Sequence, residues 1–162
     1  MTTVAVISDT HLPRGRRTLS AACVEVLAAA DLILHAGDVT RAAALDMLSE
    51  LAPVEAVHGN VDEPALRASL PPERVVVVDD VRIGMVHDGG PADGRHVRLA
   101  ARFAGCHAVV YGHTHMPELV RHAGAWILNP GSPTERRGAP HRSLIVVDVC
   151  DETMSPRIVT LP

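Results

Sequence analysis

Five short apolar runs in this chain each end in polar side chains that can bind metal ions or transfer protons. The run at residues 4–7 leads into Asp9 and His11, and the run at residues 32–34 leads into Asp38. Three further runs lead into amide, carboxylate and imidazole side chains, namely Asn60, Asp62, His87, Asp88, His113 and His115. Because the carboxyl ends of parallel strands share one edge of an α/β sheet, several of these side chains are expected to converge there.

The spacing of apolar residues predicts alternating strands and helices in the first half of the chain. Strands are expected at residues 4–8, 32–35 and 54–57, with helices at residues 18–30 and 41–51 between them. This β-α-β-α-β order is typical of parallel strands with helices packed against the sheet.

The second half of the chain is predicted to be mostly β-sheet. A hairpin is expected at residues 74–86, with its turn at Asp79 and Asp80, and a short helix is expected to end at residues 99–104. The remaining strands are expected at residues 108–111, 118–121, 125–128, 143–149 and 157–161. No linker interrupts the pattern, so residues 1–162 are predicted to form a single domain.

Composition argues against several functional classes. Aromatic residues make up only 2% of the chain, the formal net charge is −4, and all 15 basic residues are arginine, so no broad nucleic-acid-binding surface is predicted. Three widely separated cysteines argue against a disulfide framework. Neither a signal peptide nor an apolar stretch of membrane-spanning length is recognisable, so a cytoplasmic location without membrane contact is expected.

The candidate ligands are oxygen and nitrogen donors, which suit divalent ions such as Mn²⁺, Fe²⁺, Zn²⁺ and Co²⁺. They are too numerous for one ion, so two ions about 3.5–4 Å apart that share a carboxylate are predicted. Each motif alone has a simpler explanation, because Gly37-Asp38 and Gly59-Asn60 are typical turn sequences. Five such clusters in order at strand ends make coincidence a poor explanation.

The order and spacing of these motifs resemble the calcineurin-like metallophosphoesterases, specifically a subgroup of small single-domain phosphodiesterases from bacteria and archaea. The matching motifs are Asp-x-His at Asp9, Gly-Asp at Asp38, Gly-Asn-x-Asp at Asn60, a strand-end histidine at His87, and Gly-His-x-His at His113. An Asn-Pro-Gly-Ser sequence at residues 129–132 also matches, so the resemblance covers nearly the whole chain.

The resemblance implies an α/β fold, a four-layer α-β-β-α sandwich of two mixed sheets. It also implies metal ligands divided between two ions: Asp9, His11 and His115 for the first, Asn60, His87 and His113 for the second, and Asp38 for both. Thr114 would then point away as a packing or hydrogen-bonding residue. Mn²⁺ is the first expectation for both ions, with Fe, Zn, Ni or Co as alternatives.

The predicted activity is two-metal-dependent hydrolysis of phosphate esters, with phosphodiesters as the favoured class. Two cations beside one water molecule lower its pKa toward neutrality, so a hydroxide that bridges them can attack phosphorus in line. The predicted catalytic residues are Asp38, Asn60, His87 and Asp88. Three loop arginines are candidates for a bidentate contact with a phosphate oxygen: Arg14, Arg136 and Arg137.

Two positions depart from the pattern of the resembled family. Many relatives carry a histidine directly after the asparagine, which resembles a general acid, but this chain has Val61. Hydrolysis of esters with poor leaving groups is therefore expected to be slower by roughly 10²–10⁴-fold. Asp88 replaces a glycine of the subgroup, and is either a proton donor or extra ligand, or a solvent-facing loop residue. Asp62 is expected to orient a ligand as a hydrogen-bond acceptor.

Two alternative functions remain open besides phosphodiester hydrolysis. A non-catalytic scaffold that resembles the retromer subunit of this fold would bind partners through an apolar face, but would have no chemical need for a full ligand set. A phosphomonoesterase is the second alternative, and Val61 disfavours it. The expected partner is a small phosphate-ester substrate, and a homodimer is expected because relatives often form dimers.

Overall fold

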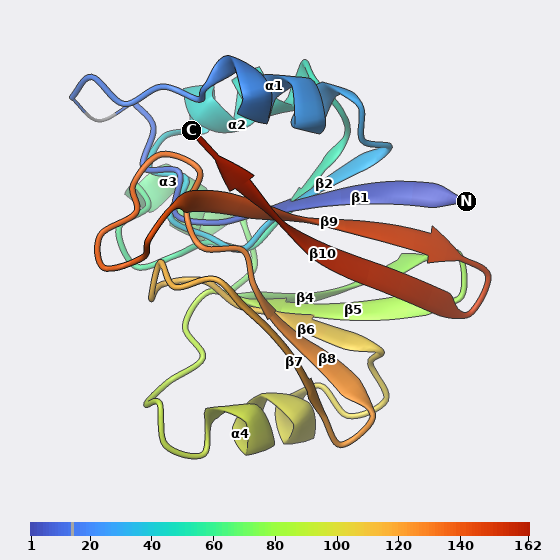
Figure 1. The fold of residues 1–162 in the computed structure, drawn as a ribbon. Helices are drawn as coiled ribbons and strands as arrows, with labels where there is room; N and C mark the ends of the chain where they lie inside the picture. The colour runs from blue at the N-terminus through green and yellow to red at the C-terminus, as the bar shows by residue number, and fades with distance from the viewer. Residues whose placement is uncertain (14) are drawn as a thin grey trace.

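Two five-stranded β-sheets packed face to face form the centre of the protein, and helices cover their outer surfaces (Figure 1). The computed structural model describes residues 1–13 and 15–162. The layers follow the order helix, sheet, sheet, helix, which confirms the α-β-β-α sandwich of two mixed sheets that the sequence predicts.

The first sheet contains β1 (Thr2–Ile7), β2 (Leu32–His35), β3 (Val54–Ala56), β9 (Arg142–Cys150) and β10 (Thr153–Leu161), in the order β10-β9-β1-β2-β3. The first three strands are parallel, and α1 (Ala21–Ala28) and α2 (Ala42–Ser49) connect them. Leu27 of α1 and Leu48 of α2 pack against the outer face of this sheet. The predicted β-α-β-α-β order is therefore confirmed.

The second sheet contains β4 (Glu73–Val78), β5 (Val81–Val86), β6 (Ala108–Val110), β7 (Glu118–His122) and β8 (Ala125–Asn129), in the order β4-β5-β6-β8-β7. Strands β5, β6 and β8 are parallel, and the two edge strands run antiparallel to them. Helix α4 (Arg95–Arg102) covers the outer face through Leu99, together with Phe103 just beyond its end. The predicted hairpin and the sheet-rich second half are confirmed.

Aliphatic side chains fill the space between the two sheets. Val4 and Val6 of β1 lie in one buried cluster with Ile83 of β5 from the opposite sheet. Successive side chains of a strand point to opposite faces, so Ala5 and Ile7 pack instead under α1 and α2. Removing both faces of β1 from water is the main force that holds these layers together.

The main differences from the predictions concern α1, α3 and β10. The helix predicted at residues 18–30 spans only Ala21–Ala28, because Ser20 accepts a hydrogen bond from the Cys23 N–H (3.3 Å) and caps it. Helix α3 (Pro64–Ser69) was not predicted, because six residues give too short a periodic pattern. Strand β10 begins before Pro156; it lies at the edge of its sheet, where proline is tolerated.

The loops after β1, β2, β3, β5 and β6 carry the candidate ligands and meet at one end of the sandwich. Within each sheet these strands are parallel, so their carboxyl ends share an edge, and face-to-face packing brings the two edges together. Among residues 1–13 and 15–162, no helix is both long and apolar enough to cross a lipid bilayer.

Candidate metal centre

Two groups of potential metal ligands converge where these five loops meet. Asp9, His11 and His115 form the first group, and Asp38, His87 and His113 form the second; within each, one ligand atom per residue lies within 4.8 Å of the others. Asn60 joins the second group, because its Oδ1 lies 3.1 Å from both His87 Nε2 and His113 Nδ1. The structure thus gathers every ligand that the sequence predicts.

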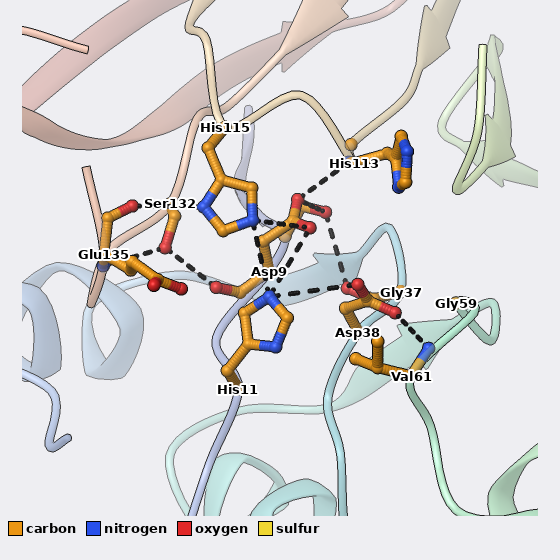
Figure 2. Close-up of polar contacts among 12 residues, drawn as sticks. Asp9, His11, Gly37, Asp38, Gly59, Val61, His113, His115, Ser132 and Glu135 are labelled. Carbon is orange, nitrogen blue, oxygen red and sulfur yellow. Dashed lines mark hydrogen bonds and ion pairs between the residues drawn. The ribbon is translucent and has the colours of Figure 1, made fainter. Parts of the chain in front are cut away.

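Asp9 lies at the centre of the first group and is fully buried. Its Oδ2 accepts hydrogen bonds from the hydroxyl of Ser8 (2.7 Å) and the backbone N–H of His113 (2.9 Å). Its Oδ1 has no hydrogen-bond partner among the described residues, and lies 3.3 Å from His115 Nε2 and 3.9 Å from His11 Nε2 (Figure 2). A buried, unpartnered carboxylate oxygen is costly in free energy, so this corner of the site fits a bound cation.

The two histidines of the first group present their Nε2 atoms to the same point. Nδ1 of His115 donates to the carbonyl of Glu135 (3.2 Å), which leaves Nε2 as the atom with the free lone pair. Burial lowers the pKa of His11, against the opposing charges of Asp38 and Asp9, and so favours its neutral form. The two Nε2 atoms lie only 3.4 Å apart, and a shared cation would be attracted to both.

Asp38 lies between the two groups and is suited to bridge them. Its Oδ1 accepts a hydrogen bond from the N–H of Val61 (3.0 Å), whereas Oδ2 lies 3.2 Å from His87 Nε2 and 3.8 Å from His11 Nε2. Burial raises the pKa of Asp38, but the hydrogen bond and the charge of His87 outweigh burial and hold this pKa at about 2. The carboxylate is therefore ionised, as a bridging ligand must be.

His87 is oriented by a backbone carbonyl in the same way as His115. Its Nδ1 donates to the carbonyl of Ala36 (2.8 Å), so Nε2 points toward Asp38 and Asn60. Burial lowers the pKa of His87. The hydrogen bond to Asp38 and the charge of Asp9 together raise this pKa by more than burial lowers it, so the net shift is upward. The site therefore concentrates negative charge around this imidazole, which also favours a cation.

Five of these ligands have a left-handed backbone, which residues other than glycine adopt rarely: Asp9 (φ 56°), His11 (φ 47°), Asp38 (φ 57°), His113 (φ 68°) and His115 (φ 58°). Hydrogen bonds between loops hold part of this geometry, from Asp9 N to Gly37 O and from His11 N to Asp38 O, both 3.0 Å. Such conformations cost about 1–3 kcal/mol each and cluster at functional sites. Sequence patterns gave no sign of this strain.

Asp62 holds the loop that carries Asp38. Its carboxylate accepts hydrogen bonds from the backbone N–H groups of Asp38 (3.2 Å), Thr40 (2.6 Å) and Gly59 (2.6 Å). The prediction that Asp62 orients a ligand as an acceptor is confirmed. Gly59 is required beside it, because a Cβ atom there would overlap Oδ1 of Asp38.

His35 supports the site from beneath. It is fully buried; its Nδ1 accepts from the N–H of Gly37 (3.2 Å), so its Nε2 donates to the hydroxyl of Thr10 (3.0 Å). Burial lowers the pKa of His35 to about 4, which keeps the ring neutral. Both ring nitrogens of His35 are thus used in hydrogen bonds that support the loops carrying the candidate ligands.

The Asn-Pro-Gly-Ser segment ties two ligand loops together. Nδ2 of Asn129 donates to the carbonyl of Gly112 (3.1 Å) and to the hydroxyl of Thr114 (3.0 Å). The hydroxyl of Ser132 donates to the carbonyl of Asp9 (2.8 Å). Thr114 is therefore a hydrogen-bonding residue, as predicted, and the motif has a structural task next to the ligands.

Other predicted site residues lie outside both groups. Asp88 is exposed, and its Oδ1 accepts a hydrogen bond from the N–H of Gly90 (2.8 Å), so its proposed catalytic role stays a prediction. Arg136 and Arg137 are exposed; Arg136 donates to the carbonyl of Pro140 (3.1 Å), and Nε of Arg137 lies 3.8 Å from Glu135. Arg14 lies outside the described residues.

Comparison with known sequences adds independent evidence. Residues 2–152 match the model of the calcineurin-like phosphoesterase superfamily domain. A probable metallophosphoesterase of Methanocaldococcus jannaschii is 36% identical over 152 residues, which cover 92% of this chain and 77% of the relative. Another from Methanothermobacter thermautotrophicus is 33% identical over 158 residues, which cover 96% of this chain and 91% of the relative.

Solved structures share the fold over almost the full length of the chain. Vps29 of Chaetomium thermophilum has a TM-score of 0.81 at 20% identity and covers 99% of this chain and 98% of its own. A Thermotoga maritima protein, solved in solution, has a TM-score of 0.78 at 29% identity and covers 99% of this chain and 100% of its own. Vps29 of Entamoeba histolytica in complex with Zn²⁺ has a TM-score of 0.76 at 24% identity, with 98% of each chain covered. The family match and the two archaeal relatives show that this chain belongs to the calcineurin-like phosphoesterase superfamily.

Proposed function

We propose that this protein is a metal-dependent phosphodiesterase. Its family supports hydrolysis of phosphate esters, and the family together with the two ligand groups supports a site for two metal ions. The single observation that carries the proposal is the buried Oδ1 of Asp9, which has no hydrogen-bond partner among the described residues and faces the Nε2 atoms of His11 and His115. This arrangement needs a cation to offset its electrostatic cost.

The proposed ligand assignment follows the two groups. Asp9, His11 and His115 would hold the first ion, and Asn60, His87 and His113 the second, with Oδ2 of Asp38 between them. Two divalent ions in this position would supply Lewis-acid stabilisation of the phosphoryl oxygens and would lower the pKa of a water molecule. Mn²⁺ is the proposed ion, and Fe, Zn, Ni and Co are alternatives that the same donor set accepts.

Burial indicates from which side a substrate approaches. The side chains of Asp9, His11 and His115 are at most 1% exposed, whereas Asn60 and His113 of the second group are exposed. The phosphate ester is therefore proposed to bind against Asn60 and His113, while the first group stays covered by the loops after β1 and β6. The hydrogen bonds from His87 and His115 to backbone carbonyls keep the donor atoms aimed before substrate arrives.

Val61 favours diesters with good leaving groups. Its side chain is 39% exposed at the position where a general acid would stand, and it has no proton to give. The N–H of Val61 is instead used to hold Oδ1 of Asp38. A substrate whose leaving group is stable as an anion does not need a proton donor, so aryl phosphodiesters are the proposed test substrates.

The test compares bis(p-nitrophenyl) phosphate with p-nitrophenyl phosphate on metal-stripped protein, before and after addition of each divalent ion. The expected result is metal-dependent hydrolysis of the diester, faster than that of the monoester, and lost in Asn60→Ala and His113→Ala. His141→Ala, at an exposed histidine that belongs to neither group, is the matched control and should keep full activity. Metal binding without hydrolysis of either ester would favour the scaffold alternative.

A further inference from the structure

A pocket of about 320 Å³ opens beside the second ligand group. The candidate ligands Asn60 and His87 form part of its wall, so a substrate bound there would extend into it. Arg67 and Arg102, which come from different helices, also line this pocket. Neither arginine has a part in the metal centre described above, and their convergence next to it calls for an anionic ligand.

Much of the positive charge in this pocket is available to a ligand. Arg67 lies exposed on α3 and forms no ion pair among the described residues. Arg102 donates through Nε to Glu73 (2.6 Å), in a pair whose side chains are 50% and 45% exposed. Such an exposed pair contributes little to stability, and it leaves the two terminal nitrogens of Arg102 without a hydrogen bond among the described residues.

A second, smaller pocket continues the first along Asp88 and Arg102, and Arg98 lines it. Arg98 donates to the carbonyls of Asp93 (2.6 Å), Gly89 (3.4 Å) and Pro91, so no carboxylate of the described residues neutralises its charge. The acidic groups nearby are Asp88, which accepts from the N–H of Gly90, and Glu73, which pairs with Arg102. The three arginines outnumber the two carboxylates, so these pockets carry a local positive charge although the formal net charge of the whole protein is −4.

We infer that Arg67 and Arg102 bind a second phosphate group of a phosphodiester whose reacting phosphate lies at the two ligand groups. This inference rests on the proposed function and deepens it, because it names diesters that carry an additional phosphate as the preferred substrate class. A guanidinium group can give two parallel hydrogen bonds to a phosphate, and two such groups from different helices fix its position. Arg98 adds to the local positive potential.

The test uses two chromogenic diesters that differ by one phosphate. The first is thymidine 5′-(p-nitrophenyl phosphate), and the second is the same compound with a phosphate on the 3′ oxygen. For the wild-type protein with Mn²⁺, kcat/KM should be at least about tenfold higher for the second compound, the size expected of a charge-assisted contact. This ratio should fall several-fold in Arg67→Ala and in Arg102→Ala, and should approach one in the double variant.

Arg157→Ala is the matched control, because Arg157 also pairs with a surface carboxylate, that of Asp148, but lies on β10. The control should keep the wild-type ratio. A preference that declines with added salt would further support an electrostatic origin. Arg67 is exposed on a short helix, so Arg67→Ala should fold normally. This variant still tests the inference if Arg102→Ala, which removes the ion pair with Glu73, destabilises α4.

Failure of this inference is distinguishable from failure of the proposed function. Metal-dependent hydrolysis of both compounds with a ratio near one, or with a ratio that the arginine variants leave unchanged, would overturn the second-phosphate site and leave the phosphodiesterase intact. Calorimetric titration of the Mn²⁺-loaded protein with thymidine 3′,5′-bisphosphate and thymidine 5′-phosphate gives a readout that needs no turnover. Equal affinities for these two nucleotides would overturn the inference whether or not the protein hydrolyses diesters.

Discussion

The carboxylate of Asp9 accepts a hydrogen bond from the backbone N–H of His113 at 2.9 Å, between residues that are 104 positions apart. Asp9 follows a strand of the first sheet and His113 follows a strand of the second, so this bond joins the two sheets at the metal centre. One oxygen of Asp9 therefore assembles the site, and the other stays available to an ion. The same side chain therefore joins the two sheets and is proposed to bind metal.

Replacing Asp9 with asparagine should separate these two tasks. The amide oxygen can still accept from Ser8 and His113, but the buried negative charge that attracts a cation is lost. We expect the loss of one metal ion per chain and at least a 10²-fold drop in diester hydrolysis, measured by elemental analysis and initial rates. Burial raises the pKa of Asp9, but the contacts with His115, His87 and Ser8 outweigh burial and hold this pKa below its ordinary value, so the metal-free variant should be less stable than the wild type at pH 7, measured by urea unfolding. Asp46→Asn, at an exposed helix position, should change neither property.

The two ions should leave in a defined order. His113 and Asn60 are exposed, whereas the ligands of the first group are buried, so a chelator should reach the second ion first. Metal content followed during stepwise dialysis against a chelator should fall from two ions to one and then to zero. His113→Ala should bind one ion from the start. Simultaneous loss of both ions in the wild type would contradict the division into a covered and an open position.

His35 should make the stability of the metal-free protein depend on pH. Its pKa is about 4 in the fold because of burial, and the unperturbed value is 6.5, so between these values the unfolded chain binds a proton that the folded chain does not. The contribution of a neutral His35 is therefore fully present above pH 6.5 and is lost as the pH falls toward 4. Relative to His35→Gln, the wild type should lose up to about 1.4 kcal/mol per pH unit in this window.

The pH comparison uses urea unfolding in the presence of a chelator at pH 7, 6 and 5. Taking the difference between His35→Gln and the wild type cancels the titration of Asp38 and the other shared groups. Parallel stability curves for the two proteins would show that His35 does not supply this pH dependence.

Gly59→Ala tests the close approach of backbone to Asp38. A Cβ at this position would overlap Oδ1 of Asp38, so the carboxylate or the loop has to move. We expect Mn²⁺ affinity and diester hydrolysis to fall by at least tenfold, measured by calorimetry and initial rates. Gly138→Ala is the control, since its nearest neighbour would be Sδ of Met116 at 3.9 Å, an ordinary contact. Normal activity in Gly59→Ala would show that the ligand loop is more tolerant than its packing indicates.

The ligand set could be predicted from sequence because each ligand follows an apolar run at a strand end. Parallel topology then requires Asp9, Asp38 and Asn60 to share one edge of the first sheet. The family resemblance predicted that His87 and His113, at the edge of the second sheet, complete the ligand set. The strand at the start of the chain was predicted from a continuous apolar run, and the structure shows why the run is continuous: Val4 and Val6 pack between the sheets, whereas Ala5 and Ile7 pack under the helices.

Features that depend on tertiary contacts were not predictable. The left-handed backbone of Asp9 and His115 is stabilised by loops distant in sequence, and the carbonyl of Glu135 orients His115 without any side-chain signal. Arg67 and Arg102 share a pocket only because α3 and α4 face it from different parts of the chain. The single domain, the small-ester partner, the homodimer and the cytoplasmic location stay predictions.

The most direct measurement is an anomalous diffraction experiment on crystals grown with Mn²⁺, at a wavelength where the scattering of manganese dominates. We expect two peaks about 3.5–4 Å apart, one among Asp9, His11 and His115 and one among Asn60, His87 and His113, with Asp38 Oδ2 next to both. A single peak, or peaks away from these ligands, would contradict a two-metal centre and with it the proposed mechanism.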